Sequence, residues 1–230
     1  MLIVHELLSK IRITSNSNNK LVTIHGSLED LRCVGIGTDA AVFQYIHNPA
    51  YAFKLYADDK KEKVQIEAKV YQKLKGSLFF PICYAVSDRY LVLSFESGIT
   101  LYDCLLQGIK IPYTVIQEVE EAQRYARASG LNPRDIHLKN VLLQNGKAKV
   151  IDVSEYLRQG NDFRWEHLKK AYKEFYHIFE GRTVPYWLLE MIRRWYNKKQ
   201  YDSIEKFLKF SSDIKIFSRK KRTGKVLPKK

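Results

Sequence analysis

Three stretches of the chain place glycines, a lysine and oxygen-bearing side chains in one order. They are the run Val34, Gly35, Ile36, Gly37, Thr38, Asp39, Ala40, Ala41 and Val42, then Lys54, then Asp135, Asn140 and Asp152. Backbone N–H groups beside glycines can cradle phosphates, a lysine can neutralise them, and carboxylate and amide oxygens can hold Mg²⁺. Together these stretches predict transfer of a phosphoryl group from ATP, with Mg²⁺ as the metal.

The glycine-containing run lies between two predicted strands. Dinucleotide-binding folds place such glycines between a strand and a helix, so the context argues against that class. A hairpin suits a flap whose backbone covers nucleotide phosphates, with Val42 packing on the adenine ring. For the glycines alone, an ordinary tight hairpin is the simpler interpretation.

Lys54 ends an apolar stretch that begins at Tyr51. It must reach solvent or pair with an anion, because burying an unpaired ammonium group is costly. Glu62 and Glu67 of the following predicted helix are candidate partners, and Glu67 is expected nearer the packed face because its neighbours are apolar. The alternative is a surface salt bridge that contributes about 1 kcal/mol or less.

Asp135 and Asn140 belong to one polar loop, and Asp152 follows after a predicted β-hairpin turned at Asn145 and Gly146. Two strands joined by such a turn would return Asp152 to the side of Asn140. Their oxygens would then be ligands for Mg²⁺ together with the phosphates. Asp135 would be free to accept the proton of an attacking hydroxyl.

The elements expected to position these groups divide the chain into a β-rich part and a helical part. Strand patterns occur at 21–26, 31–37, 40–47, 51–56, 81–87 and 90–96, with a helix at 60–75. Beyond Gly98, helices are predicted from Thr100 and at 113–129, 162–179, 185–197 and 202–210, with strands at 140–143 and 148–151. Apolar residues from Leu2 to Ile11 recur at helical spacing and predict an amphipathic helix at the start.

We therefore expect four segments. Residues 1–19 form the amphipathic helix and a polar loop, 20–97 a nucleotide-binding lobe, 98–212 a lobe with the catalytic loop and the metal site, and 213–230 a basic tail.

The chain is strongly basic, with a formal net charge of +14. Such a charge suits ATP, anionic substrates or nucleic acid. An accessory hypothesis is a weak contact with nucleic acid or an anionic surface. It would be made by the basic tail and by the Lys, Arg and aromatic residues around 187–199. The three cysteines indicate neither a disulfide framework nor a zinc site. No apolar stretch approaches the roughly 20 residues that span a bilayer, so a transmembrane segment is not expected and the cytoplasm is the default location.

The combined motifs resemble those of the protein-kinase-like superfamily, over residues 30 to 170. The run 34–42 is similar to the glycine-rich loop, with Ala40 in place of its third glycine, and Lys54 and Glu67 are similar to the paired lysine and glutamate. Pro133–Asp135 followed by Asn140 resembles the catalytic loop, and Asp152–Ser154 stands where the metal-binding Asp-Phe-Gly stands. The overall likeness is to the short proteins classed as serine/threonine-protein kinases in spore-forming bacteria, with features of lipopolysaccharide kinases and aminoglycoside phosphotransferases.

This resemblance implies an α+β, bilobal protein-kinase-like fold with a small antiparallel β-rich N-lobe and a mainly helical C-lobe. It implies ATP and Mg²⁺ as cofactors, Asp135 and Lys54 as catalytic residues, and Asn140 and Asp152 as metal ligands. The contacts to ATP would come from Lys54, Glu67 and the residues of the glycine-rich run, Val34, Gly35, Ile36, Gly37, Thr38, Asp39, Ala40 and Val42.

The departures from the family pattern bear on which molecule accepts the phosphoryl group. No Ala-Pro-Glu follows Asp152, and a helix is predicted only ten residues on, at Asp162, so the activation segment is minimal. Asp162 would tie down the catalytic loop. A serine/threonine-protein kinase is the leading hypothesis; a kinase of a small molecule or sugar, which His137 favours, and a pseudokinase scaffold or nucleotide-binding module are the alternatives. The sequence does not identify the molecule that accepts the phosphoryl group.

Overall fold

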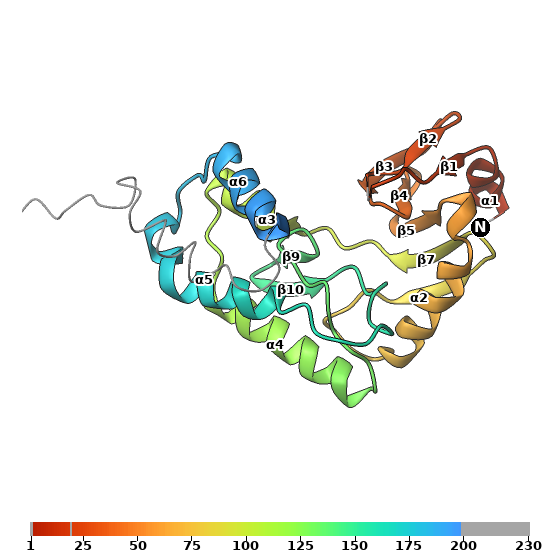
Figure 1. The fold of residues 1–230 in the computed structure, drawn as a ribbon. Coiled ribbons are helices and arrows are strands. Elements are labelled where there is room, and N and C mark those ends of the chain that lie inside the picture. The colour runs from red at the N-terminus through yellow and green to blue at the C-terminus, as the bar shows by residue number, and fades with distance from the viewer. Residues whose placement is uncertain (1, 19, 199–230) are drawn as a thin grey trace, which may run out of the picture.

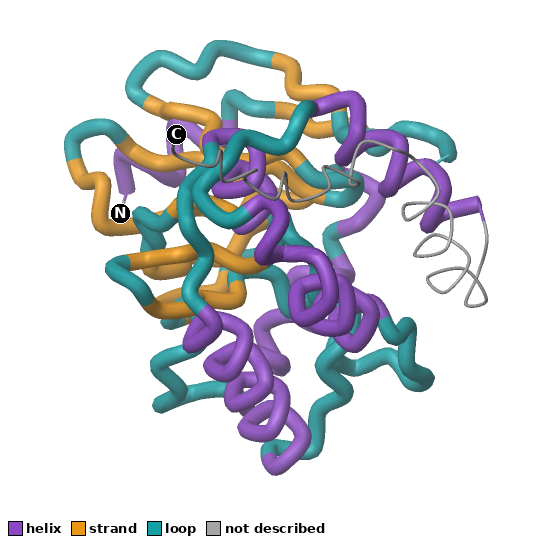
Figure 2. The backbone as a smooth tube through the Cα atoms, turned by 90° about the vertical axis from the view of Figure 1, so that its left-hand side faces the viewer, coloured by secondary structure: helices purple, strands orange, loops and turns teal. Residues whose placement is uncertain are grey.

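The computed structural model describes residues 2–18 and 20–198. Its first part is rich in antiparallel strands and its second part is mainly helical (Figure 1). Figure 2 shows the same division from the side, with the strands largely at the upper left and long helices below them. The expected α+β class and its order along the chain are confirmed.

A five-stranded antiparallel sheet dominates the first part, in the order β3-β4-β5-β7-β6. Its strands are β3 (Leu31–Ile36), β4 (Ala40–Tyr45), β5 (Asn48–Tyr56), β7 (Tyr90–Ser94) and β6 (Cys83–Val86). Between β5 and β6 the chain forms a short 3-10 helix, η1 (Asp58–Lys60), and then α2 (Glu62–Lys73). All of these strands, and α2, were predicted from the sequence within a few residues.

The two faces of this sheet pack against different elements. Alternate residues of a strand point to opposite faces. Phe53 and Leu55 of β5 belong to a cluster with the N-terminal residues Leu8 and Ile13. Tyr56 belongs to a second cluster that contains the apolar residues of α2. The N-terminal segment therefore covers one face of the sheet and α2 the other.

The N-terminal segment differs from its prediction. Its helix, α1 (Leu2–Ser9), ends before Ile11, and the chain continues as β1 (Arg12–Thr14), which pairs with β2 (Thr23–His25). Ile11 and Ile13 are almost fully buried, at 1% and 0% exposure. Burial against the sheet, rather than helical spacing, therefore explains these apolar residues.

Up to residue 198, the second part of the chain holds four helices and a small sheet. They are α3 (Leu101–Gln107), α4 (Tyr113–Ala128), α5 (Arg164–Phe179) and α6 (Tyr186–Lys198), with β8 (Ile99–Thr100), β9 (Val141–Gln144) and β10 (Lys147–Val150) in the order β10-β9-β8. The Thr100 hydroxyl caps α3 by accepting the Asp103 N–H at 3.0 Å. The short strand β8 has no clear sequence signal and was not predicted.

Helix α5 begins at Arg164, two residues later than predicted. Phe163, which precedes it, has φ +53°, a left-handed conformation that cannot continue a right-handed helix. The side chain of Asp162 accepts the Arg164 N–H at 3.2 Å. The predicted helix at 202–210 and the basic tail lie outside the described residues, as do the side chains of 195–198.

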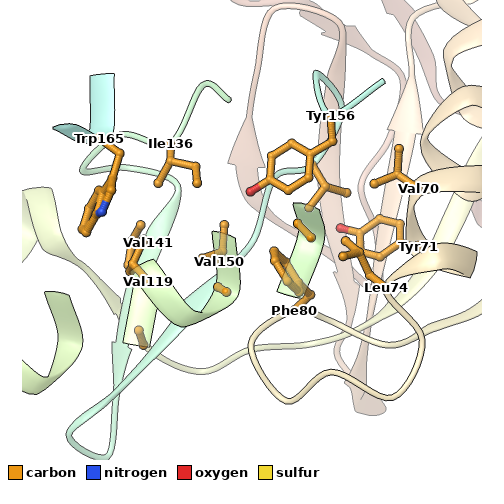
Figure 3. Packing of buried hydrophobic residues seen from close by; sticks show 14 of the residues in the cluster. Val70, Tyr71, Leu74, Phe80, Val119, Ile136, Val141, Val150, Tyr156 and Trp165 are labelled. Carbon is orange, nitrogen blue, oxygen red and sulfur yellow. The ribbon is translucent and has the colours of Figure 1, made fainter. Parts of the chain in front are cut away.

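One apolar cluster connects the two parts of the molecule. Figure 3 shows Val70, Tyr71 and Leu74 of α2 on one side of it, and Val141, Val150 and Trp165 from the helical part on the other. Tyr156 and Phe80 lie between them, with their rings edge to face at 6.1 Å. No helix within the described residues is long and apolar enough to cross a membrane.

Candidate active site

Lys54 lies on β5 and forms the centre of a buried charge cluster. Its Nζ is 2.8 Å from both carboxylate oxygens of Glu67 on α2 and 3.2 Å from Oδ1 of Asp152. The side chains of Lys54 and Glu67 are 11% and 1% exposed, whereas that of Asp152 is 37% exposed. Three segments far apart in the sequence thus meet at one ammonium group.

The geometry selects Glu67 over Glu62 as the partner of Lys54. Glu67 lies on the face of α2 that packs against the sheet, and Glu62 is exposed. The Tyr56 hydroxyl also donates to Glu67, at Oε2. Tyr56 is two residues after Lys54 and so shares its face of β5. That spacing could have identified Tyr56 from the sequence, but it was missed.

The charges of this cluster hold Lys54 protonated. Burial would lower the pKa of its ammonium, but the neighbouring carboxylates of Asp152 and Glu67 outweigh burial and raise the pKa above its ordinary value. Burial would likewise raise the pKa of Asp152, yet Lys54 and the N–H of Ser154 bring it below its ordinary value. A fixed positive charge therefore faces an ionised carboxylate.

Asp135 lies in the loop before β9 and has a left-handed backbone, with φ +56°. Its N–H donates to Asp162 Oδ2 at 2.7 Å, which holds the loop against the start of α5. Its carboxylate Oδ1 accepts from Nη1 of Arg164 at 2.5 Å. The expectation that Asp135 is free is therefore corrected, because one of its oxygens is already paired.

Burial raises the pKa of Asp135 to about 6, although Arg164 acts against this rise. Burial also lowers the pKa of nearby His137, to about 4, and Arg164 contributes in the same direction. Near neutral pH, Asp135 is thus mostly ionised and His137 is neutral. Arg164 was missed from the sequence because nothing in the spacing of its helix marks it as a partner of Asp135.

Asn140 and Asp152 flank the β9–β10 hairpin. Val141 pairs with Val150, and the Ile151 N–H donates to the Asn140 carbonyl at 3.0 Å, so the hairpin returns the chain as expected. The Asn140 side-chain nitrogen donates to the Asp135 carbonyl at 3.1 Å, which leaves its amide oxygen as an acceptor.

These two oxygen-bearing side chains fit Mg²⁺, which takes one or two protein ligands together with phosphates and water. Within the described part of the chain, no group of three or more His, Cys, Asp or Glu residues is placed to hold a metal. The chemistry of the donor set therefore suits a metal that arrives with a phosphorylated ligand better than an all-protein metal cage.

The glycine-containing run forms the β3–β4 hairpin, with a register shift between Cys33 and Gly35. The Gly37 N–H donates to the Ala40 carbonyl at 2.8 Å, and Ala40 is buried, which places its methyl group in the core. The amides of Thr38 and Asp39 donate no hydrogen bond to any other described residue. These two N–H groups at the tip are the ones left for an anion.

The tip of the hairpin is tied to the rest of the sheet and to α2. The Asp39 carboxylate accepts from Lys63 Nζ of α2 at 2.7 Å, and its carbonyl accepts the Ala57 N–H at 2.8 Å. The Gly37 carbonyl accepts the N–H of Val22 at 2.9 Å. The hairpin that would cover phosphates is thus connected to the helix that carries Glu67.

Comparison with known proteins gives one informative match. The chain is 36% identical, over 185 residues, to "Putative serine/threonine-protein kinase YrzF" of Bacillus subtilis (strain 168), and the match covers 79% of this chain and 86% of that protein. No protein-family model matches the chain.

Proposed function

The chain belongs to the protein-kinase-like family, and on that premise we propose that it is an ATP- and Mg²⁺-dependent phosphotransferase with a bilobal kinase fold. The leading acceptor class is a serine or threonine hydroxyl of a protein. The observation that carries the proposal is the contact of Lys54 with both Glu67 and Asp152, at 2.8 and 3.2 Å. This contact brings together three elements that carry the charged groups of the proposed phosphoryl transfer: β5, α2 and the loop after β10.

In this proposal each polar residue has a separate task. Lys54, held in position by Glu67, neutralises the phosphates, and the free amides of Thr38 and Asp39 contribute further donors. Asn140 and Asp152 hold Mg²⁺, which when bound neutralises charge on the transferring phosphoryl group. Asp135, fixed by Asp162, orients the acceptor hydroxyl and takes its proton. Positioning and charge neutralisation supply most of the rate enhancement in such chemistry.

The test is transfer from labelled ATP in the presence of Mg²⁺, with autophosphorylation and generic protein acceptors as readouts. Asp135→Asn and Asp152→Asn are expected to abolish transfer while the circular dichroism spectrum stays unchanged. Asp88→Asn, which changes an exposed aspartate of the β6–β7 turn, is the matched control. Full activity in either active-site variant would refute the assigned role.

A pseudokinase is the second candidate, and the Arg164–Asp135 pair favours it because it occupies an oxygen of the proposed base. Thermal unfolding with and without Mg-ATP shows whether the protein binds the nucleotide. A nucleotide at 100 times its Kd adds about 2.7 kcal/mol of stability. Stabilisation without any transfer would favour a nucleotide-binding module, and transfer would exclude the pseudokinase.

A further inference from the structure

An open cavity of about 490 Å³ lies where the N-terminal segment meets the start of α2, and it is lined mainly by cationic side chains. In Figure 1, α1, β1 and the beginning of α2 lie together near the N-terminus. Three separate segments line the cavity: Ser9 to Arg12, Asp58 with Lys61, and Arg89. Among the described residues that line it, the cations are Lys10, Arg12, Lys61 and Arg89, and the one carboxylate is that of Asp58.

One carboxylate is shared among three of these cations. Asp58 Oδ1 lies 3.2 Å from Nη2 of Arg89 and 3.7 Å from Nζ of Lys61, and Asp58 Oδ2 lies 3.6 Å from Nε of Arg12. Lys10 contacts Glu6 at 3.8 Å, outside the cavity. A single negative charge cannot neutralise three positive ones, so the cavity keeps a net positive charge with unused N–H donors.

Arg89 is held in place and still has an unused donor. Its Nη2 donates to the Ile11 carbonyl at 3.0 Å as well as to Asp58. Its Nε is buried and has no hydrogen-bond partner among the described residues. The two Nη2 contacts fix the guanidinium group of Arg89 at the edge of the cavity.

We propose that this cavity binds a phosphate group, as inorganic phosphate or as a phosphate ester. Arginine forks and lysine ammonium groups match the several oxygens and the double charge of phosphate. A carboxylate ligand would supply fewer acceptors and half the charge. Because Lys61 directly precedes α2, the bound phosphate would connect the N-terminal segment to the helix that carries Glu67. The cavity is separate from the Lys54 cluster, and the inference does not depend on the proposed function.

The test is a titration of the full-length protein with inorganic phosphate, followed by amide NMR at constant ionic strength, with sodium chloride as the reference titrant. We expect saturable shifts at the amides of Ser9–Arg12, Asp58–Lys61 and Arg89. Arg12→Gln and Lys61→Gln are each expected to raise the apparent Kd about five-fold or more, as loss of one charge-assisted contact would. Lys61→Arg, which keeps the charge, is expected to retain binding.

Arg32→Gln on β3 and Lys69→Gln on α2 are the matched controls, because both change exposed cations that do not line the cavity. They should leave the apparent Kd for phosphate unchanged. The inference is overturned if phosphate gives no saturable shift at the cavity amides, if chloride gives the same shifts, or if the control variants weaken binding equally. A phosphoserine peptide distinguishes the two sources, since tighter binding than that of inorganic phosphate identifies a phosphate ester as the ligand.

Discussion

Replacing Lys54 with methionine would leave the Glu67 carboxylate buried without its cation. Glu67 is 1% exposed and would keep only the Tyr56 hydroxyl as a side-chain hydrogen-bond donor. Asp152 is 37% exposed, so water can replace Lys54 there at little cost. Removing one partner of a buried pair costs about 3–5 kcal/mol of stability. We assign most of that loss to Glu67.

The loss should depend on pH, with a sign fixed by the burial of Glu67. Burial raises the pKa of Glu67, and Lys54 opposes this rise, so the methionine variant should raise the pKa further. The unfolded chain then releases its proton near pH 4.3 while the folded chain keeps it. The free energy of unfolding of the variant therefore falls as pH rises from about 4.3 towards the raised pKa of Glu67, by at most about 1.4 kcal/mol per pH unit.

Urea unfolding of the wild type and of Lys54→Met at pH 5 and pH 8 measures both effects. The stability difference between them should be larger at pH 8. In Lys54→Met/Glu67→Gln the additional pH dependence relative to the wild type should disappear, because position 67 no longer carries a titratable acid. Lys69→Met, an exposed position of α2, is the control and should change little. A loss below about 1 kcal/mol, or a loss independent of pH, would refute the reasoning.

Two further predictions concern packing. Leu8→Ala should lower the free energy of unfolding in urea by about 2–5 kcal/mol, because Leu8 is 1% exposed. Ile3→Ala on the same helix should change it by no more than about 0.5 kcal/mol, because Ile3 is 62% exposed. Equal effects would show that α1 is not part of the core. Gly98→Ala should lower the free energy of unfolding by about 1–3 kcal/mol and lower the melting temperature. The added Cβ would lie 2.8 Å from both Leu142 Cβ and the Leu143 carbonyl oxygen, which is too close. An unchanged melting temperature would contradict this contact.

Local sequence patterns were enough to predict most elements. Alternating apolar residues and turn signals located β3 to β7 and the β9–β10 hairpin, because period-two patterns and turn residues act over a few residues. The pairing of Lys54 with Glu67 followed from a buried lysine that needs an anion. The roles of Asp135, Asn140 and Asp152 remain predictions.

The sequence determined by itself the order of most elements and the candidate residues for holding phosphates and a metal, since these depend on residue type and spacing. Only the tertiary structure decided that Ile13 forms a strand under the sheet, that Arg164 pairs with Asp135, and that Arg89 and Lys61 share one cavity. These contacts join residues 28 or more positions apart, or depend on burial against a distant face. Such pairings are set by how the elements pack, and neither periodicity nor local spacing encodes them.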